Sequence, residues 1–419
     1  MSKQEQSAES EGRTELPIER GFPIERVNEI ADKEGWAKMY YRPIYTMHKW
    51  WARRMGSVFR SICLYALTNN PDDIDVVDPS KNNGLNRYLE NESDIGKYID
   101  GIDMASPEGL WALFNKDVKI SNKKVLDPFM GGGTGVVEAS RFGVTVDGID
   151  LNPVAWFVTK KEIEAGQTDL EDAQSAFEQV ENKVADELKS YYKTPCPNGN
   201  HDADALYFFW NKELECTSCE TTVPLFNDYR IGKGRYGMDG YEVLCPDCHS
   251  IIQTDDWRSE TNCTCGNEFI PSDGTVTGSN YTCHSCGQKY PITRGVQDQG
   301  GFDLDIYAVE YHCTECDANG LEKSEVKGYK PAEEADYDLY NRASEKWSQS
   351  DELSAYVPDY DIQRGAITAS SSINGNDVFE HGYNKWTDMY SDRQLLCFSK
   401  LLEAIDEVPN QNLKEYLLM

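Results

Sequence analysis

The sequence of 419 residues contains no long apolar run. No stretch approaches the roughly 20 apolar residues that a membrane-spanning helix needs. Residues 1–15 are polar and charged, without the apolar centre of a secretory signal. We therefore expect a cytoplasmic protein with no membrane partner, long enough for two or three domains with cores of their own.

Basic residues are scarce, because 41 lysines and arginines stand against 72 aspartates and glutamates, for a net charge of −31. At ordinary ionic strength such a chain is repelled by nucleic-acid phosphates. The acids, however, are spread over the whole chain, and salt at about 1 M shortens the range of charge repulsion to about 3 Å. We interpret this composition as that of a halophilic protein working in a salt-rich cytosol.

Acidic residues are absent from residues 35–71, where the average density of the chain would place about six. From His48 onwards the spacing predicts a helix, with an apolar face formed by Trp51, Met55, Val58, Ile62 and Tyr65. We predict that the basic and aromatic residues here contact nucleic acid or form a wall of a cofactor pocket. They are His48, Lys49, Trp50, Arg53, Arg54 and Arg60. The structural alternative is a buried helix whose arginines pair with acids elsewhere.

A glycine-rich turn follows the strand predicted at residues 124–127 and opens a helix, and a second strand, at 144–150, ends in Asp150. Units of this kind hold nucleotide-like cofactors, because glycines let a ligand approach the backbone and the strand-end acid accepts ribose hydroxyls. The third glycine of the dinucleotide fingerprint is missing, and Asp127-Pro128-Phe129 precedes the turn. We therefore expect a cofactor that has no phosphate to be bound at this turn. The alternative is a glycine turn in a doubly wound sheet of another kind.

Thirteen cysteines are present, and eight of them form four Cys-x-x-Cys pairs. Cys263 and Cys265 form a fifth pair, and Cys196 with His201 can form a sixth. Since a structural zinc takes four nitrogen or sulfur ligands, six pairs predict three zinc ribbons. Pairing in chain order gives Cys196, His201, Cys216 and Cys219; then Cys245, Cys248, Cys263 and Cys265; then Cys283, Cys286, Cys313 and Cys316. A ribbon of 216/219 with 245/248 remains an alternative, and Cys63 and Cys397 are expected to be packing residues.

Three blocks of sequence, at residues 18–30, 41–54 and 127–134, resemble the adenine-specific DNA methylases that contain a zinc ribbon. The N-terminal part of that family is the domain of unknown function 1156, and the acidic composition is similar to that of a halophilic archaeal member. The resemblance spans residues 15–419. It implies an α/β fold: an incomplete Rossmann-like methyltransferase domain that depends on S-adenosylmethionine and carries an inserted series of zinc ribbons.

The resemblance also implies DNA as substrate, with N6 of adenine as the most favoured target, and a role in restriction–modification. By the same resemblance, S-adenosylmethionine and about three zinc ions are the cofactors. The expected cofactor-binding residues match the glycine-turn motif and the acid after the second strand. They are Asp127, Pro128, Phe129, Gly131, Gly133, Thr134, Asp150 and Asn152.

The second motif of amino-group methyltransferases, (Asp/Asn/Ser)-Pro-Pro-(Tyr/Phe/Trp), is missing, because no Pro-Pro occurs in the chain. In the family this motif accepts the exocyclic amine and stacks on the flipped base. We therefore expect no catalytic residue in this chain, and a second polypeptide that supplies the missing half. An apolar pattern that runs to Met419 favours a split enzyme or a fragment. The alternatives are a non-catalytic zinc-ribbon module with a vestigial cofactor fold, and an RNA amino-group methyltransferase.

The expected organisation has six parts. They are a disordered tail at 1–15, a basic helical element at 16–70, the cofactor-binding part at 71–165, a connecting helix at 166–193, the zinc-ribbon insertion at 194–330, and a helical segment at 331–419 that looks truncated. In the last part, Ser391 and Gln394 form a predicted capping box, and Asn410 is expected to cap another helix. A sheet of two strands is too small to cover a core, so further strands are expected from elsewhere.

Overall fold

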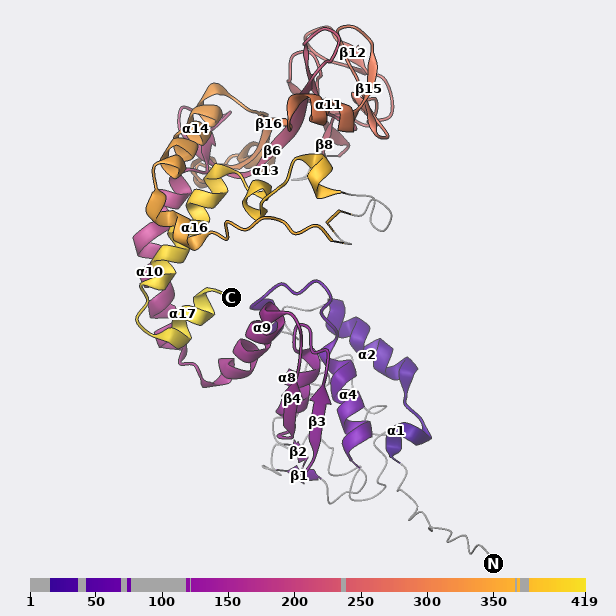
Figure 1. Cartoon of the computed structure of the whole chain (residues 1–419), viewed down its shortest axis with the longest axis vertical. Helices are drawn as coiled ribbons and strands as arrows, with labels where there is room; N and C mark the ends of the chain where they lie inside the picture. The colour runs from indigo at the N-terminus through magenta and orange to yellow at the C-terminus, as the bar shows by residue number, and fades with distance from the viewer. Residues whose placement is uncertain are drawn as a thin grey trace, which may run out of the picture. The chain divides into compact units, whose positions relative to one another are not determined.

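The structure is a computed structural model that describes residues 16–36, 43–68, 74–76, 118–120, 122–234, 239–365, 368–369 and 377–419. It is a mixed α/β protein with several small sheets. The chain divides into two compact units, residues 1–176 with 410–419, and residues 177–409 (Figure 1). The predicted tail and most of residues 71–120, in the predicted cofactor-binding part, lie outside the described residues. None of the helices in the described ranges combines the length and apolarity needed to cross a bilayer.

The first unit consists of short strands and the helices that pack on them. In chain order these are α1 (Pro17–Arg20), α2 (Ile24–Trp36), η1 (Pro43–Thr46), α4 (Gly56–Leu67), β1 (Ile74–Val76), β2 (Val118–Ile120), β3 (Lys124–Asp127), α8 (Thr134–Arg141), β4 (Thr145–Gly148), α9 (Pro153–Glu164), η5 (Ala165–Gln167) and α17 (Gln411–Leu417). The helix α10 (Leu170–Ser190) starts in this unit and continues into the second.

The centre of the first unit is the parallel pair of β3 and β4, joined through the helix α8. Val125 and Val146 pack against a core to which α2, α4 and the end of α8 also contribute. Phe142, the C-cap residue of α8, is buried in that core. The strand–turn–helix–strand unit predicted from the glycine turn is therefore present at the predicted positions.

The helix predicted from His48 is wrong in its first half, because α4 begins only at Gly56. Residues 47–55 form turns and extended chain after η1. Glu34 of α2 explains where the helix starts, since its carboxylate accepts hydrogen bonds from the Gly56 and Ser57 backbone N–H groups at 3.1 and 2.9 Å. Trp51, predicted on the apolar face, is 87% exposed. The apolar pattern holds only from Val58 onwards.

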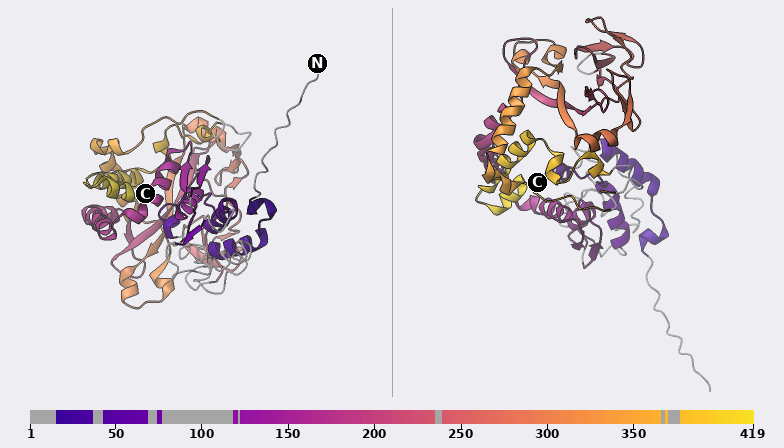
Figure 2. Two further views of the ribbon diagram at one scale, coloured as in Figure 1. Left: turned by 90° about the horizontal axis from the view of Figure 1, so that it is seen from below. Right: turned by 45° about the horizontal axis from the view of Figure 1, so that its top comes forward.

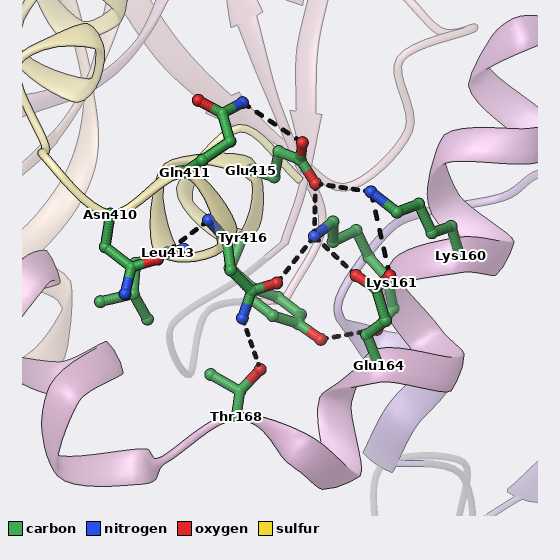
Figure 3. Close-up of polar contacts among 10 residues, drawn as sticks. Lys160, Lys161, Glu164, Thr168, Asn410, Gln411, Leu413, Glu415 and Tyr416 are labelled. Atoms are coloured by element: carbon green, nitrogen blue, oxygen red, sulfur yellow. Dashed lines mark hydrogen bonds and ion pairs between the residues drawn. The ribbon is translucent and has the colours of Figure 1, made fainter.

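The helix α17 packs on α9 within the first unit (Figure 3). Asn410 caps it by accepting hydrogen bonds from the Asn412 and Leu413 backbone N–H groups, as the sequence predicts. Glu415 lies 2.5 Å from the Lys161 ammonium, and the Tyr416 hydroxyl donates to the Lys161 carbonyl at 2.9 Å. The last ten residues therefore belong to the unit that contains the glycine turn.

The second unit contains one larger sheet, several hairpins and a group of helices. Its strands are β5 (Lys193–Pro195), β6 (Asp202–Glu215), β7 (Thr222–Pro224), β8 (Arg230–Lys233), β9 (Tyr241–Leu244), β10 (Ile251–Thr254), β11 (Thr261–Asn262), β12 (Glu268–Phe269), β13 (Val276–Thr277), β14 (Asn280–Thr282), β15 (Lys289–Pro291), β16 (Asp303–His312) and β17 (Lys327–Pro331). Its helices, besides α10, are α11 (Ile292–Gln299), α12 (Thr314–Ala318), α13 (Lys323–Val326), α14 (Glu334–Ser348), η6 (Asp351–Tyr356), η7 (Val378–His381), η8 (Trp386–Met389) and α16 (Asp392–Asp406).

The long strands β6 and β16 pair antiparallel and form the middle of this sheet, in the order β17-β16-β6-β5. The helices α10, α14 and α16 lie side by side in Figures 1 and 2, around a core that includes Tyr191, Ala343 and Leu396. The predicted capping box at the start of α16 is confirmed, because Ser391 and Gln394 exchange side-chain and backbone hydrogen bonds. Asp169 likewise accepts hydrogen bonds at the start of α10, which is the predicted connecting helix.

Candidate cofactor pocket and metal centres

The glycine turn is held by backbone hydrogen bonds between the ends of β3 and β4. The Ile149 N–H donates to the Asp127 carbonyl at 2.9 Å, and the Met130 N–H donates to the Ile149 carbonyl at 3.1 Å. Gly131 and Gly133 have φ values of 51° and 79°, in the left-handed region that disfavours side chains. The glycines at these two positions are therefore required by the turn itself.

Asp150 links the second strand to the glycine turn. One carboxylate oxygen accepts from the Gly131 N–H at 2.8 Å and the other from the Asn152 N–H at 2.9 Å. These backbone donors lower the pKa of Asp150, so the group is ionised at neutral pH. Since a carboxylate offers about four acceptor positions, Asp150 retains capacity for hydroxyl donors of a ligand. Asn152 instead uses its side chain to cap α9 through the Val154 N–H at 2.9 Å.

A pocket of about 490 Å³ opens beside this turn, within the size range of small-molecule sites. One wall consists of residues 125–132 with Thr134 and Gly135, and the other comes from the acid-free segment and α4. The residues of that segment that line it are Trp50, Ala52, Arg53 and Arg54. Phe129, at 86% exposure, stands in the first wall. The structure thus brings the two sequence features together in one cavity.

Trp50 lies directly over the glycine turn. A Cβ atom added to Gly132 would come within 2.7 Å of the Trp50 ring, so the close approach explains why a glycine occupies this position. Arg53 continues the contact, because its guanidinium donates a hydrogen bond to the Gly132 carbonyl. His48 contacts the Met419 carbonyl at 3.1 Å, while Lys49 lies over the exposed Trp51 ring at 4.2 Å.

A buried ion pair fixes Arg53 in this position. Its guanidinium lies 2.7 Å from the carboxylate of Glu162 on α9 and stacks on the Tyr45 ring, 4.7 Å from the ring centroid. Burial raises the pKa of Glu162 to about 7, against the lowering effect of Arg53. Arg53 therefore connects η1, the glycine turn and α9. No pattern in the sequence singled out Glu162.

Arg60 requires a correction, because it is fully buried and does not line the pocket. Its guanidinium pairs with Glu138 of α8, whose carboxylate also accepts a hydrogen bond from the Tyr45 hydroxyl and lies 3.3 Å from Arg141. Arg60 lies on the buried side of α4, so the predicted contact with nucleic acid or cofactor is wrong for this residue. The structural alternative, an arginine paired with an acid elsewhere, describes it correctly.

The twelve predicted metal ligands gather into three groups, and within each group all ligand atoms lie within 4.8 Å of one another. The groups are Cys196, His201, Cys313 and Cys316; Cys216, Cys219, Cys283 and Cys286; and Cys245, Cys248, Cys263 and Cys265. Sulfur–sulfur distances such as 3.6 Å for Cys196–Cys316 and 3.5 Å for Cys248–Cys263 are close to the edge of a zinc-centred tetrahedron, about 3.8 Å for bonds of about 2.3 Å. The donor sets and their spacing therefore fit zinc.

Each Cys-x-x-Cys pair of the second and third groups sits in a tight hairpin turn. In these turns the first cysteine N–H donates to a carbonyl beyond the second cysteine, as between Cys216 and Thr221 at 2.9 Å. The residue after the second cysteine is left-handed in Glu220, His249 and Gly287, with φ between 57° and 70°. This repeated backbone geometry presents both thiols to the same point.

The pairing in chain order is wrong for two of the three groups. The antiparallel ladder of β6 and β16 explains the difference, because it sets His312 opposite Asp204 and Asp303 opposite Glu213. The first ligand pair is thereby placed beside the last, and the second beside the fifth. Only the innermost group, at 245–265, combines pairs that are neighbours in the chain. The sites are nested, which spacing alone did not indicate.

A family model described as a protein of unknown function, DUF1156, matches residues 21–91. The predicted resemblance to this domain is confirmed for that segment, which contains the acid-free stretch and thus one wall of the pocket. No curated protein and no solved structure matches the chain.

Proposed function

We propose that this chain is the cofactor-binding and DNA-engaging part of an S-adenosylmethionine-dependent DNA methyltransferase, with adenine N6 as the most favoured acceptor. The observation that carries the proposal is the closure of the glycine turn on the ionised Asp150, next to a pocket of about 490 Å³. The methyl donor in this proposal, S-adenosylmethionine, is a small cationic molecule that contains a ribose and no phosphate.

The lining of the pocket supports a cationic cofactor. Trp50, Phe59 and Phe129 contribute aromatic rings, and Asp127 contributes a carboxylate. Aromatic faces and carboxylates both attract a cation, and the cofactor supplies a methyl group on a positively charged sulfur. The carboxylate of Asp150, by contrast, repels a pyrophosphate at the position where a dinucleotide would place one.

The fixed orientation of the Asp150 carboxylate supports its proposed role as the acceptor for the ribose hydroxyls. The carboxylate is held from both sides by backbone N–H groups of the turn and of α9, so its orientation is fixed before a ligand arrives. A preorganised acceptor loses little entropy when it takes the ribose hydroxyls. The chain thus contributes positioning of the methyl donor, and no covalent step is assigned to it.

We assign DNA contact to the exposed cations of the acid-free segment. Lys49 and Arg54 are exposed, whereas Arg53 is held by Glu162 and Arg60 by Glu138. Phosphates can therefore reach Lys49 and Arg54, and Arg54 also borders the pocket. The proposed DNA-binding group is thus smaller than the six residues that the sequence suggested.

A second polypeptide is part of the proposal. Beside the parallel pair β3–β4, the side chains of Leu126, Ile149 and Leu151 are exposed. Parallel sheets normally have both faces covered, so these side chains suit cover by a further polypeptide. That polypeptide would also carry the (Asp/Asn/Ser)-Pro-Pro-(Tyr/Phe/Trp) acceptor motif.

The experiment is transfer of tritiated methyl groups from S-adenosylmethionine to unmethylated duplex DNA in concentrated KCl. The chain is assayed alone and together with the product of the adjacent downstream reading frame. We expect transfer only with both polypeptides and N6-methyladenine as the product. Transfer by this chain alone would contradict the split of the two motifs, and cofactor binding without transfer in either case would favour a non-catalytic module.

A further inference from the structure

A second pocket, of about 510 Å³, is lined entirely by residues of the second unit. Its floor is one face of β6, and its sides are the start of β16 and residues 382–394. Aromatic side chains dominate its lining, among them Tyr207, Trp210, Phe302, Tyr383 and Tyr390. Neither the glycine-turn motif nor the metal ligands contribute to it.

Two of these rings are open to solvent. Tyr207 is 63% exposed and Tyr390 is 51% exposed, although each borders a concave site. Leu206, Leu304 and Met389 are exposed at the same rim. Flat aromatic faces that are left in contact with water beside a pocket are the surfaces on which nucleobases stack.

Two cations line the same pocket, in a chain whose net charge is −31. The Lys212 ammonium lies 4.3 Å from the Phe302 ring centroid and 5.2 Å from that of Tyr383. Lys212 pairs across the ladder with Leu304, and the next pair is Glu213 with Asp303. Because successive strand residues point to opposite faces, the acids are on the other side of the sheet.

The second cation, Arg393, is only 3% exposed and is held by aromatic rings instead of a carboxylate. Its guanidinium lies 3.8 Å from the Phe208 ring centroid and 4.9 Å from that of Tyr192. It donates to the Tyr191 carbonyl at 3.3 Å, while its Nε has no hydrogen-bond partner. Among the described residues no carboxylate forms an ion pair with Arg393, and the nearest acidic influence is the longer-range attraction of Asp336.

The one acid in the lining, Asp388, is already engaged. Its carboxylate accepts hydrogen bonds from the backbone N–H groups of Asn384 and Lys385, both at 2.8 Å. The pocket therefore combines stacking surfaces, two cations and a carboxylate that caps η8. A base next to a phosphate is the chemistry that suits the stacking surfaces and the two cations.

We propose that this pocket binds an unpaired nucleotide of a DNA strand, with its base stacked on Tyr390 and its phosphate beside Lys212 and Arg393. That the strand is DNA rests on the proposed function; the stacking and charge argument stands on the pocket alone. A duplex buries its base faces, so the pocket selects a single-stranded or extruded nucleotide.

The test measures fluorescence anisotropy of a labelled single-stranded oligodeoxyadenylate of about 12 nucleotides, titrated with the full chain. We expect tighter binding than to the same sequence as a duplex. Tyr390→Ala should weaken binding about tenfold, the order of one lost stacking contact. Lys212→Gln should weaken it and lower the slope against the logarithm of the salt concentration by about one.

The matched controls are Tyr360→Ala, an exposed tyrosine outside the pocket, and Arg258→Gln, a cation over the Trp257 ring at 4.3 Å. Both should bind the oligonucleotide like the unaltered chain. Circular dichroism and zinc content confirm that each variant is folded. Equal effects of pocket and control variants, or no binding by the unaltered chain, would overturn the proposal. An RNA strand or free dAMP that competes as well as the DNA strand would overturn the choice of ligand.

Affinity for S-adenosylmethionine is measured on the same proteins. Pocket variants that lose the oligonucleotide and keep the cofactor support this pocket as a separate site. A chain that binds the oligonucleotide and fails to bind the cofactor refutes the proposed function and leaves this inference standing. The reverse result refutes this inference alone.

Discussion

Buried charged residues organise the first unit at the scale of single side chains. Glu138 and Glu162 receive Arg60 and Arg53, and the two arginines hold the acid-free segment on α8 and α9. Breaking a buried pair by removing one partner is strongly destabilising, because a charge is left without compensation. Arg53 and Arg60 are therefore first of all structural, and the exposed Lys49 and Arg54 are the described cations left for the proposed DNA contact.

Glu162 gives the unit a pH dependence whose sign follows from its pKa. The folded value of about 7 exceeds the ordinary 4.5, so the native state holds a proton that the unfolded state releases. The free energy of unfolding is therefore highest below about pH 4.5 on this account and falls as the pH rises to about 7.

Glu162→Gln should remove that dependence. Between pH 5 and pH 7 the free energy of unfolding of the unaltered chain should fall by a few kcal/mol relative to that of the variant, at about 1.4 kcal/mol per pKa unit. Urea unfolding of both proteins at several pH values measures it, with Glu171→Gln on the exposed start of α10 as control. A difference between the two proteins that stays constant with pH would contradict the assigned pKa shift.

The site residues that follow a local spacing could be predicted from the sequence, and those that depend on tertiary packing could not. The glycine turn, Asp150 and all twelve cysteine and histidine ligands were visible because each follows a local spacing. Arg60 was misassigned, since a pattern of charges does not reveal a buried carboxylate 78 residues away on α8. Trp50 was singled out as an aromatic neighbour, but its position over Gly132 depends on tertiary packing.

At the scale of elements, the ladder of β6 and β16 decides which cysteines share a metal. The strands β3 and β4 and the helices α10 and α16 could be predicted from the sequence. Strand pairing over 100 residues could not, because a ladder register is fixed by contacts distant in the sequence. The same limit explains the helix α4, whose start is set by Glu34 of another helix.

Double substitutions distinguish nested from sequential metal sites. Metal analysis of the unaltered chain should give about three zinc ions. Cys219→Ser combined with Cys286→Ser should remove one, because both belong to one group, and Cys286→Ser combined with Cys316→Ser should remove two. If the first double variant lost two zinc ions and the second lost one, the result would support the pairing in chain order.

The contact of α17 with α9 gives a second prediction at this scale (Figure 3). Lys161 and Lys160 lower the pKa of Glu415 to about 2, below the ordinary 4.5. Its contribution to stability is therefore complete above about pH 4.5 and lost as the pH falls towards 2. Glu415→Gln should cost about 1 kcal/mol at neutral pH, as expected for a partly exposed pair, and nothing at pH 2.

Chemical denaturation at both pH values measures the effect, and Glu407→Gln, in the exposed pair with Lys183, is the control. A cost for Glu415→Gln that is as large at pH 2 as at neutral pH would show that packing, not charge, is responsible.

At the scale of the whole molecule, the chain combines a pocket beside the glycine turn in one unit with three nested candidate metal sites and an aromatic pocket in the other. The description of the family model that matches residues 21–91 names no activity. The proposed function therefore depends on the pocket beside the glycine turn. The acidic composition sets the conditions of any test, because DNA binding by a chain of charge −31 is expected only where salt screens the repulsion.

Calorimetric titration of the chain with S-adenosylmethionine, in concentrated KCl, tests the central claim most directly. We predict one binding site per chain, weakened at least tenfold by Asp150→Ala, as expected for the loss of hydrogen bonds to a charged group. Asp147→Ala, at an exposed position of β4, should bind like the unaltered chain. No binding by the unaltered chain, or equal binding by the Asp150→Ala variant, would contradict the assignment of this pocket to the cofactor.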